Sequence, residues 1–177
     1  MRKVNLGKTI QEFYEEGIKD EYLVMNIVEQ YLGGKTYKSS KEDDIYKHID
    51  FYWNSPKKGL IGIDVKGVKR NGRNDKEKDD SINWIELQGV TGFPGWIYGE
   101  AEYIAFRTNK DIIFVKRNTL VEFAEKTVKG KDTVYRLPKE CYVPYQRYGR
   151  KDKVFKCKTE DLRKLSENNG FILTLND

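Results

Sequence analysis

The sequence predicts a single α+β domain in which helices flank a mixed central sheet. Two segments with helical spacing of apolar residues lie at the start and past the middle of the chain. Between them lie several segments rich in aromatic and β-branched residues, which is typical of strands. The chain has 177 residues, 38% of them hydrophobic, and no internal repeat or linker divides it. We therefore expect one domain over residues 1–177, with a less regular C-terminal region at about 131–177.

The clearest predicted helix covers residues 20–32. Its apolar residues recur every three or four positions, Asp20 suits the N-cap, and Gly33 suits the C-terminal stop. A shorter helical segment precedes it, and we expect a break near Gly17 because glycine disfavours a helix interior.

The first strands are predicted at residues 45–53 and 60–68. Both segments are rich in aromatic and β-branched residues, and the turn "NSPKKG" between them makes a β-hairpin. A polar, charged loop follows, which we expect to be flexible. A third strand is predicted at about residues 82–90.

The second half of the chain is predicted to contain another hairpin and another helix. The segments "EYIAFRT" and "DIIFVKR" form the hairpin, joined near Asn109 and Lys110. Thr119 and Glu122 form a capping box that begins a helix ending near Gly130. A short helix after Thr159 and the apolar segment "GFILTL" close the chain.

Composition excludes several kinds of chemistry. The net charge of +5 is compatible with a phosphate-rich partner. Cys141 and Cys157 lack CxxC spacing, so we expect free thiols. The single histidine, His48, excludes histidine-based nucleases, HExxH zinc hydrolases and Ser-His-Asp enzymes. With no long apolar stretch, we expect a cytoplasmic protein with no membrane partner, whose chemistry depends on carboxylates and lysines.

The stretch "LIGIDVKGVK" carries two charges inside an apolar strand. Side chains alternate along a strand, so Asp64 and Lys66 share one face. A short hairpin brings Asp50 beside Asp64, although the sequence does not fix the register. Two close carboxylates repel unless a cation lies between them, and oxygen ligands suit Mg²⁺ or Mn²⁺. We expect Lys66 to orient a water and to offset the charge that develops on a phosphodiester.

Two further segments offer ligands to this site. Trp84, Glu86 and Gln88 share one face of the third strand, so Glu86 or Gln88 extends the polar cluster. Glu29 lies on the flank of the apolar stripe of the first helix and supplies another carboxylate if that helix packs across the sheet.

These motifs resemble the PD-(D/E)XK nuclease superfamily over about residues 20–116. The shared features are an aspartate followed by "IDVK" one strand later, a strand with "ELQ", and a preceding helix that bears a glutamate. The run "WIELQGVTGFPGWIYGEAEYIAF" is also similar to small phage-encoded members. One departure is Ile49, which stands where the superfamily has proline. By this resemblance Glu29 would be the acidic residue of the first helix.

The resemblance implies a restriction-endonuclease-like core and a role for each motif residue. Asp50 and Asp64 would bind the metal, and the main-chain carbonyl of Val65 would complete its shell. Lys66 would be the catalytic lysine, and Gln88 would match the glutamine often found one strand later. The implied activity is Mg²⁺-dependent hydrolysis of DNA.

Basic residues around these motifs are candidates for phosphate contacts, with ordinary solubilising charge as the alternative. In the segment "YQRYGRKDK", tyrosines alternate with basic residues, which suits stacking on bases and neutralisation of the backbone. The candidate nucleic-acid-binding residues are Lys57, Lys58, Lys69, Arg70, Arg73, Arg147 and Arg150.

Three functions follow from these patterns. The first is a metal-dependent endonuclease acting on DNA by in-line attack of water. The second is a nucleic-acid-binding protein on the same fold without catalysis, and the third is a protein-interaction module that uses the 12 tyrosines and 8 phenylalanines. The structure of the DNA substrate and the formation of a homodimer stay open at this point.

Overall fold

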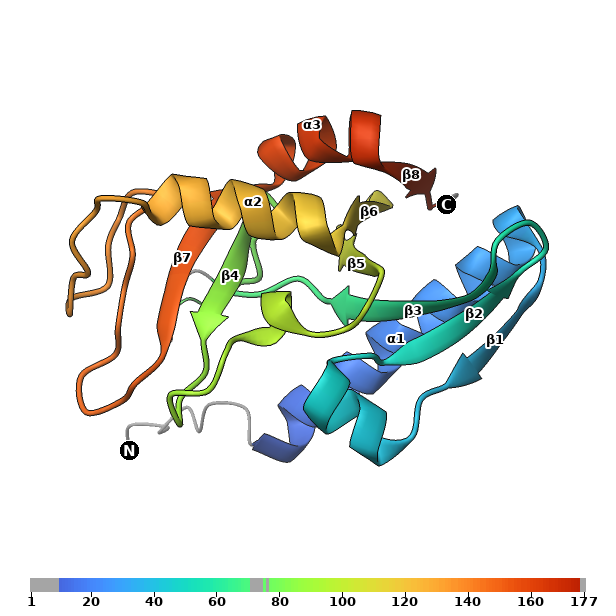
Figure 1. Ribbon diagram of the computed structural model, residues 1–177, viewed down its shortest axis with the longest axis horizontal. Helices are drawn as coiled ribbons and strands as arrows, with labels where there is room; N and C mark the ends of the chain where they lie inside the picture. The colour runs from blue at the N-terminus through green and yellow to red at the C-terminus, as the bar shows by residue number, and fades with distance from the viewer. Residues whose placement is uncertain (1–9, 71–74, 76, 176–177) are drawn as a thin grey trace, which may run out of the picture.

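The computed structural model describes residues 10–70, 75 and 77–175, with side chains described from residue 15 onward. The chain starts with a long helix and continues through strands that build a central sheet (Figure 1). The elements are α1 (Ile10–Leu32), β1 (Lys35–Lys38), η1 (Asp43–Lys47), β2 (Phe51–Ser55), β3 (Gly59–Lys66), β4 (Ile82–Gln88), η2 (Trp96–Tyr98), β5 (Tyr103–Arg107), β6 (Asp111–Lys116), α2 (Arg117–Val128), β7 (Lys153–Lys158), α3 (Thr159–Asn169) and β8 (Gly170–Thr174).

The central sheet has six strands in the order β1-β2-β3-β5-β6-β8. Strands β3 and β5 run parallel, and the other neighbours run antiparallel. The predicted α+β class with a mixed central sheet is therefore confirmed. Strands β4 and β7 form a separate two-stranded antiparallel sheet, seen at the left in Figure 1.

Two apolar clusters cover the two faces of the six-stranded sheet. Helix α1 packs on one face, where Val24, Met25 and Val28 meet the inward side chains of β2, β3 and β5. The other face is covered by α2, α3, η2 and the β4-β7 sheet. The residues of this second cluster include Ile85, Leu87, Ile97, Ile104, Phe106, Ile113, Leu120, Phe155 and Leu162.

Helix α1 is continuous, so the predicted break near Gly17 is wrong. Among the described residues, no atom beyond the surrounding backbone of the helix lies within 4 Å of a Cβ built on Gly17, and the helix continues through it. Glycine costs about 1 kcal/mol in a helix interior, which packing of the apolar face outweighs. The predicted end is confirmed, because Gly33 has a φ of +70° and its N–H donates to the Glu29 carbonyl.

The predicted strand at residues 45–53 is wrong in its first half. Residues Asp43–Lys47 form the single turn of π-helix η1, and β2 starts only at Phe51. Asp43 accepts from the Tyr52 hydroxyl at 3.0 Å and pairs with the Lys47 ammonium at 2.7 Å. His48 then turns the chain with a left-handed φ of 53°. These side-chain interactions outweigh the strand propensity of the aromatic and β-branched residues.

The third predicted strand forms but does not join the first hairpin. Strand β4 pairs with β7, while β3 pairs with β5 through the register Ile63↔Tyr103. The apolar face of β4, Ile85 and Leu87, packs over the central sheet instead of extending it. The predicted hairpin of residues 102–108 and 111–117 is confirmed as β5 and β6.

The helix predicted from the Thr119–Glu122 capping box begins two residues earlier. Helix α2 starts at Arg117, and its N-cap, Lys116, makes no side-chain capping bond. The predicted C-terminal helix and strand form as α3 and β8, and β8 is an edge strand of the central sheet. None of the described helices is long and apolar enough to span a membrane.

Candidate functional site

The β2-β3 hairpin brings Asp50 beside Asp64. The backbone N–H of Asp50 donates to the Ile63 carbonyl at 2.9 Å, one residue before the register pair Phe51↔Ile63. The Asp50 Oδ2 accepts the backbone N–H of Val65 at 2.6 Å, which fixes its carboxylate against β3. Asp50 is 9% exposed and Asp64 only 1%. The predicted convergence of these two carboxylates is therefore present.

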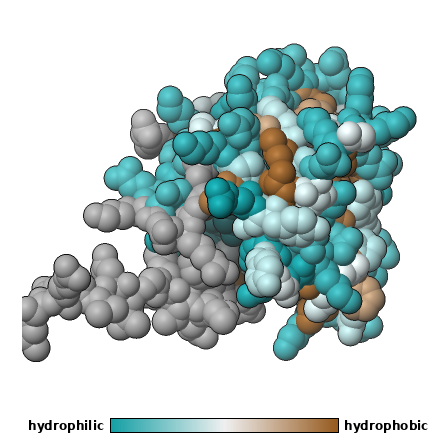
Figure 2. All heavy atoms as spheres, turned by 90° about the vertical axis from the view of Figure 1, so that its left-hand side faces the viewer, coloured by the Kyte–Doolittle hydropathy of each residue, from teal (hydrophilic) through white to brown (hydrophobic). Residues whose placement is uncertain are grey.

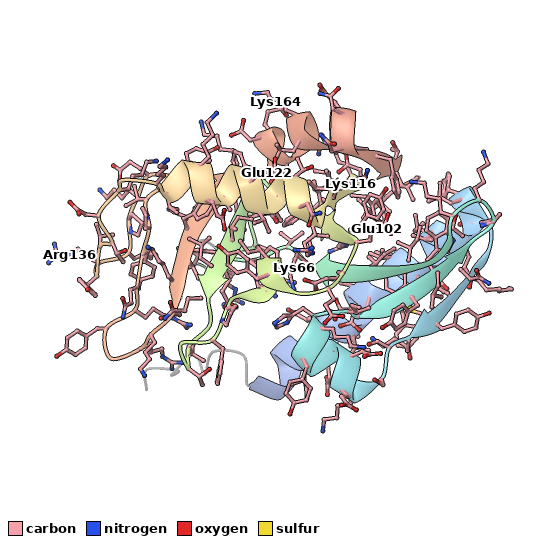
Figure 3. The ribbon with its side chains drawn as sticks, in the orientation of Figure 1. Lys66, Glu102, Lys116, Glu122, Arg136 and Lys164 are labelled. Atoms are coloured by element: carbon pink, nitrogen blue, oxygen red, sulfur yellow. The ribbon has the colours of Figure 1, made fainter. Side chains whose placement is uncertain are left out.

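Lys66 shares the face of Asp64, as the alternation of the strand predicted. The apolar residues Ile63 and Val65 face helix α1, whereas the Lys66 Nζ lies 2.6 Å from the Asp64 Oδ1. The ammonium also lies 4.6 Å from the centre of the Trp96 ring, a cation–π contact. Figure 3 shows Lys66 in the middle of the molecule, near the end of β3 and η2, while the other labelled residues lie further out.

Burial and charge shift the pKa values of this pair in the same direction. Burial raises the pKa of Asp64 well above its usual value, and the neighbouring Asp50 raises it further, against the lowering effect of Lys66. Burial lowers the pKa of Lys66, but the charges of Asp64 and Asp50 outweigh that effect and leave it raised. Lys66 is therefore a fixed positive charge at neutral pH.

Glu86, and not Gln88, is the β4 residue that interacts electrostatically with Lys66. Burial raises the pKa of Glu86, and both the Trp96 backbone amide and the Lys66 ammonium lower it. Gln88 instead donates from its Nε2 to the Lys151 carbonyl at 2.7 Å. Its side chain thus serves the neighbouring loop, so the predicted role of Gln88 in the site is not supported by its contacts.

Glu21 is an α1 carboxylate whose pKa is raised by burial and by the charge of Asp50, whereas Glu29 contacts Thr36 and Lys35. Glu29 accepts the backbone N–H of Thr36 at 2.6 Å and the Thr36 hydroxyl at 2.9 Å, which ties the end of α1 to β1. Glu21 lies two helical turns earlier, bonds to Lys38, and has a pKa raised by burial and by the charge of Asp50. A signal for Glu21 was present, because it shares the helix face of Val24 and Val28 at positions i, i+3 and i+7.

The residues present fit a hard cation held by few protein ligands. The buried Asp64 Oδ2 accepts no hydrogen bond from the described part of the chain, and the Asp50 carboxylate lies close enough to act on Asp64. Within residues 10–70, 75 and 77–175, no three or more His, Cys, Asp or Glu side chains are grouped as a metal-binding cluster. Mg²⁺ commonly takes one or two carboxylates and keeps several waters, so the pair meets that need. The role of the Val65 carbonyl stays a prediction.

Trp96 and His48 both lie beside Lys66, although the sequence did not indicate either as a site residue. The ring of Trp96 lies over Lys66 and packs edge-on against Phe106, with ring centroids 6.2 Å apart. Burial and the charge of Lys66 lower the pKa of His48, which keeps this imidazole neutral at pH 7. No motif pointed to Trp96, because the packing of η2 against Lys66, 30 residues earlier in the chain, places it. His48 lies only two residues before Asp50, so its position beside the site is local.

The predicted basic residues divide into two groups by position. Lys57 and Lys58 lie in the turn that joins Ser55 to Gly59, at the opposite end of the hairpin from Asp50, so the prediction that they flank the site is wrong. Lys69 is exposed three residues beyond Lys66.

The other predicted basic residues lie nearer to β4. The Arg70 carbonyl accepts the Trp84 indole N–H at 3.2 Å. Arg147 pairs with the buried Asp152, and both charges act on Glu86, whereas Arg150 is exposed. Arg73 lies outside the described residues.

Comparison of the chain with protein-family models, curated proteins and solved structures finds no match. The restriction-endonuclease-like core therefore remains a prediction.

Proposed function

We propose that the protein is a Mg²⁺-dependent deoxyribonuclease of the PD-(D/E)XK type. The observation that supports this most strongly is the buried Asp50–Asp64 pair. One Asp64 oxygen accepts no hydrogen bond from any residue that the structure describes, and the Lys66 ammonium lies 2.6 Å from the other oxygen. Two carboxylates beside a fixed cation suit the binding of a metal and an anionic phosphodiester.

The residues of the site would divide the chemistry as follows. Asp50 and Asp64 would hold the Mg²⁺, which when bound supplies Lewis-acid polarisation of the phosphodiester. Lys66 would offset the negative charge that develops on the phosphate and would orient the attacking water. Trp96 holds the ammonium from the other side through its ring, which limits the positions that Lys66 can adopt.

A DNA-binding protein without catalysis is the alternative, and one observation favours it. The ion pair between Lys66 and Asp64 already compensates the buried carboxylate without a metal. If that pair serves only to stabilise the sheet, the protein would bind DNA in a salt-dependent way and leave it intact.

The experiment that separates the two is a cleavage assay on supercoiled plasmid and on labelled oligonucleotides. The wild-type protein should cut with Mg²⁺ or Mn²⁺ and not with EDTA. Lys66→Ala should abolish cutting, while Lys156→Ala is the matched control, because it removes another buried ammonium that donates to the Lys139 carbonyl. Binding without cutting by the wild-type protein would support the alternative.

A further inference from the structure

Two loops at one end of the β4-β7 sheet form a tip that carries exposed aromatic rings and basic side chains. The tip consists of residues 89–93, which follow β4, and residues 147–151, which precede β7. Phe93 is 74% exposed and Tyr148 is 93% exposed, so both side chains lie largely in solvent. Such rings lack the packing that normally accounts for large aromatic residues.

The charged residues of the tip are all basic. The stretch "LQGVTGFPG" has no charged residue, and "PYQRYGRK" has three basic residues and no acidic one. Asp152, next in the chain, is fully buried and paired with Arg147. Among the described residues, Arg150 and Lys151 form no ion pair, so their charge is available to an anionic partner.

Hydrogen bonds hold the two loops of the tip together. The Lys151 backbone N–H donates to the Val90 carbonyl at 3.3 Å, and the Gln88 Nε2 donates to the Lys151 carbonyl at 2.7 Å. Gly149, with a φ of +71°, closes the tight turn in which Arg150 N–H donates to the Arg147 carbonyl. The rings and charges are thus presented on a braced framework, which lowers the entropic cost of binding.

The tip is connected to the proposed site through neighbouring elements. The ring of Trp96 lies 4.6 Å from the Lys66 ammonium, and the adjacent Gly95 donates its backbone N–H to the Leu87 carbonyl at 3.0 Å, at the end of β4 from which residues 89–93 of the tip continue. The tip and Lys66 are thus connected through η2 and the end of β4. Figure 2 looks onto this side of the molecule, and where the grey atoms leave it visible the surface is mostly hydrophilic with separated apolar residues.

We infer that the tip binds single-stranded DNA, so that the proposed nuclease prefers substrates with an unpaired strand beside the cleavage point. This inference rests on the proposed function. Exposed aromatic rings stack on bases whose faces are free, and bases inside a duplex are already stacked on their neighbours. Arg150 and Lys151 neutralise the phosphates of the same strand.

The test measures binding in EDTA, so that it does not depend on cleavage. The probes are a labelled oligothymidylate of about 12 nucleotides, a blunt duplex, and the same duplex with a single-stranded tail. The wild-type protein should prefer the oligothymidylate and the tailed duplex. Phe93→Ala and Tyr148→Ala should each weaken binding to the oligothymidylate by roughly fivefold or more. Replacing Arg150 and Lys151 by Ser should reduce the salt slope by about 0.7 per lost contact.

Matched controls lie at the far side of the molecule. Tyr37→Ala removes an exposed tyrosine from edge strand β1, and serine replacement of Lys57 and Lys58 removes two charges from the hairpin turn; both should leave binding unchanged. A preference for blunt duplex, or unchanged binding by Phe93→Ala and Tyr148→Ala, overturns the inference. So does a lack of DNA binding with self-association that these variants abolish, which would assign the tip to a second copy of the chain.

The two proposals fail in different ways. If the tip variants lose binding to single strands but the wild-type protein cuts nothing with Mg²⁺, the nuclease proposal fails and the tip remains a site for single-stranded DNA. If the wild-type protein cuts blunt and tailed duplexes equally and the tip variants cut normally, the inference fails and the nuclease proposal stands.

Discussion

Lys66 and Asp64 form a largely buried ion pair on one face of a strand whose other face is apolar. The ammonium lies 2.6 Å from the Asp64 Oδ1, and the two side chains are 23% and 2% exposed. A central strand carries these charges because each compensates the other, and because Asp50 on β2 adds a second carboxylate to the same place. The pair is both a stabilising contact and the centre of the proposed site.

Lys66→Met should lower the free energy of unfolding by about 2 to 4 kcal/mol, because it leaves a buried carboxylate without its cation. The double variant Asp64→Asn, Lys66→Met removes both charges and should recover most of that loss. Urea unfolding of the wild type, both single variants and the double variant measures the coupling. A double variant that is less stable than Lys66→Met by the full cost of Asp64→Asn would show that the pair is not coupled.

Glu21→Gln should reduce Mg²⁺-dependent cleavage by about tenfold or more at limiting metal, because Glu21 is the helix carboxylate in electrostatic contact with Asp50. Glu29→Gln is the matched control on the same helix. It should leave cleavage unchanged and lower stability slightly through the loss of its bonds to Thr36. Loss of cleavage in Glu29→Gln with none in Glu21→Gln would support the original prediction for Glu29.

Local patterns predicted much of this fold and half of the site. The hairpin of β5 and β6, the helix ending at Gly33 and the shared face of Asp64 and Lys66 depend on neighbours within a few residues, which the sequence displays directly. Asp50 needed only a short hairpin to reach Asp64.

Long-range choices could not be predicted in the same way. Ile85 and Leu87 alternate on β4 identically whether that strand extends the central sheet or packs over it, and its partner β7 lies some 70 residues further along the chain. The helix carboxylate nearest to Asp50 could not be predicted for a similar reason, since only the crossing of α1 over β2 decides which residues of the helix lie near the site.

Gly17→Ala should raise the free energy of unfolding by up to about 1 kcal/mol, because the helix is continuous there and a Cβ meets no described atom within 4 Å apart from the helix's own backbone. Gly95→Ala is the contrasting substitution. Its Cβ would lie 2.1 Å from the Glu86 carbonyl oxygen, so β4 and η2 must separate and stability should fall. Thermal unfolding of both variants checks this pair, and destabilisation by Gly17→Ala would contradict a continuous helix.

The ion pair of Asp111 and Arg163 should make the free energy of unfolding depend on pH in the acidic range. Burial raises the pKa of Asp111, but hydrogen bonds from Arg163 and Thr108 outweigh it and lower the pKa below the usual 3.8. A lowered folded-state pKa gives stability that is present above about pH 4 and lost as the pH falls through the folded value. Asp111→Asn should therefore cost about 1 to 3 kcal/mol at about pH 7 and much less at about pH 2. Urea unfolding of the wild type and of Asp111→Asn at both pH values tests this. An equal difference in stability at the two pH values would contradict it.

The most direct measurement of the central claim is single-turnover cleavage of a tailed DNA duplex by the wild-type protein and by Asp64→Asn, prepared identically and shown by circular dichroism to be folded. With Mg²⁺ and saturating protein, the wild type should cut the duplex, and Asp64→Asn should lose activity by orders of magnitude while still binding the DNA. Cleavage by Asp64→Asn at the wild-type rate, or a wild-type protein that cuts no form of DNA with Mg²⁺ or Mn²⁺, would contradict the assignment of the Asp50–Asp64–Lys66 site.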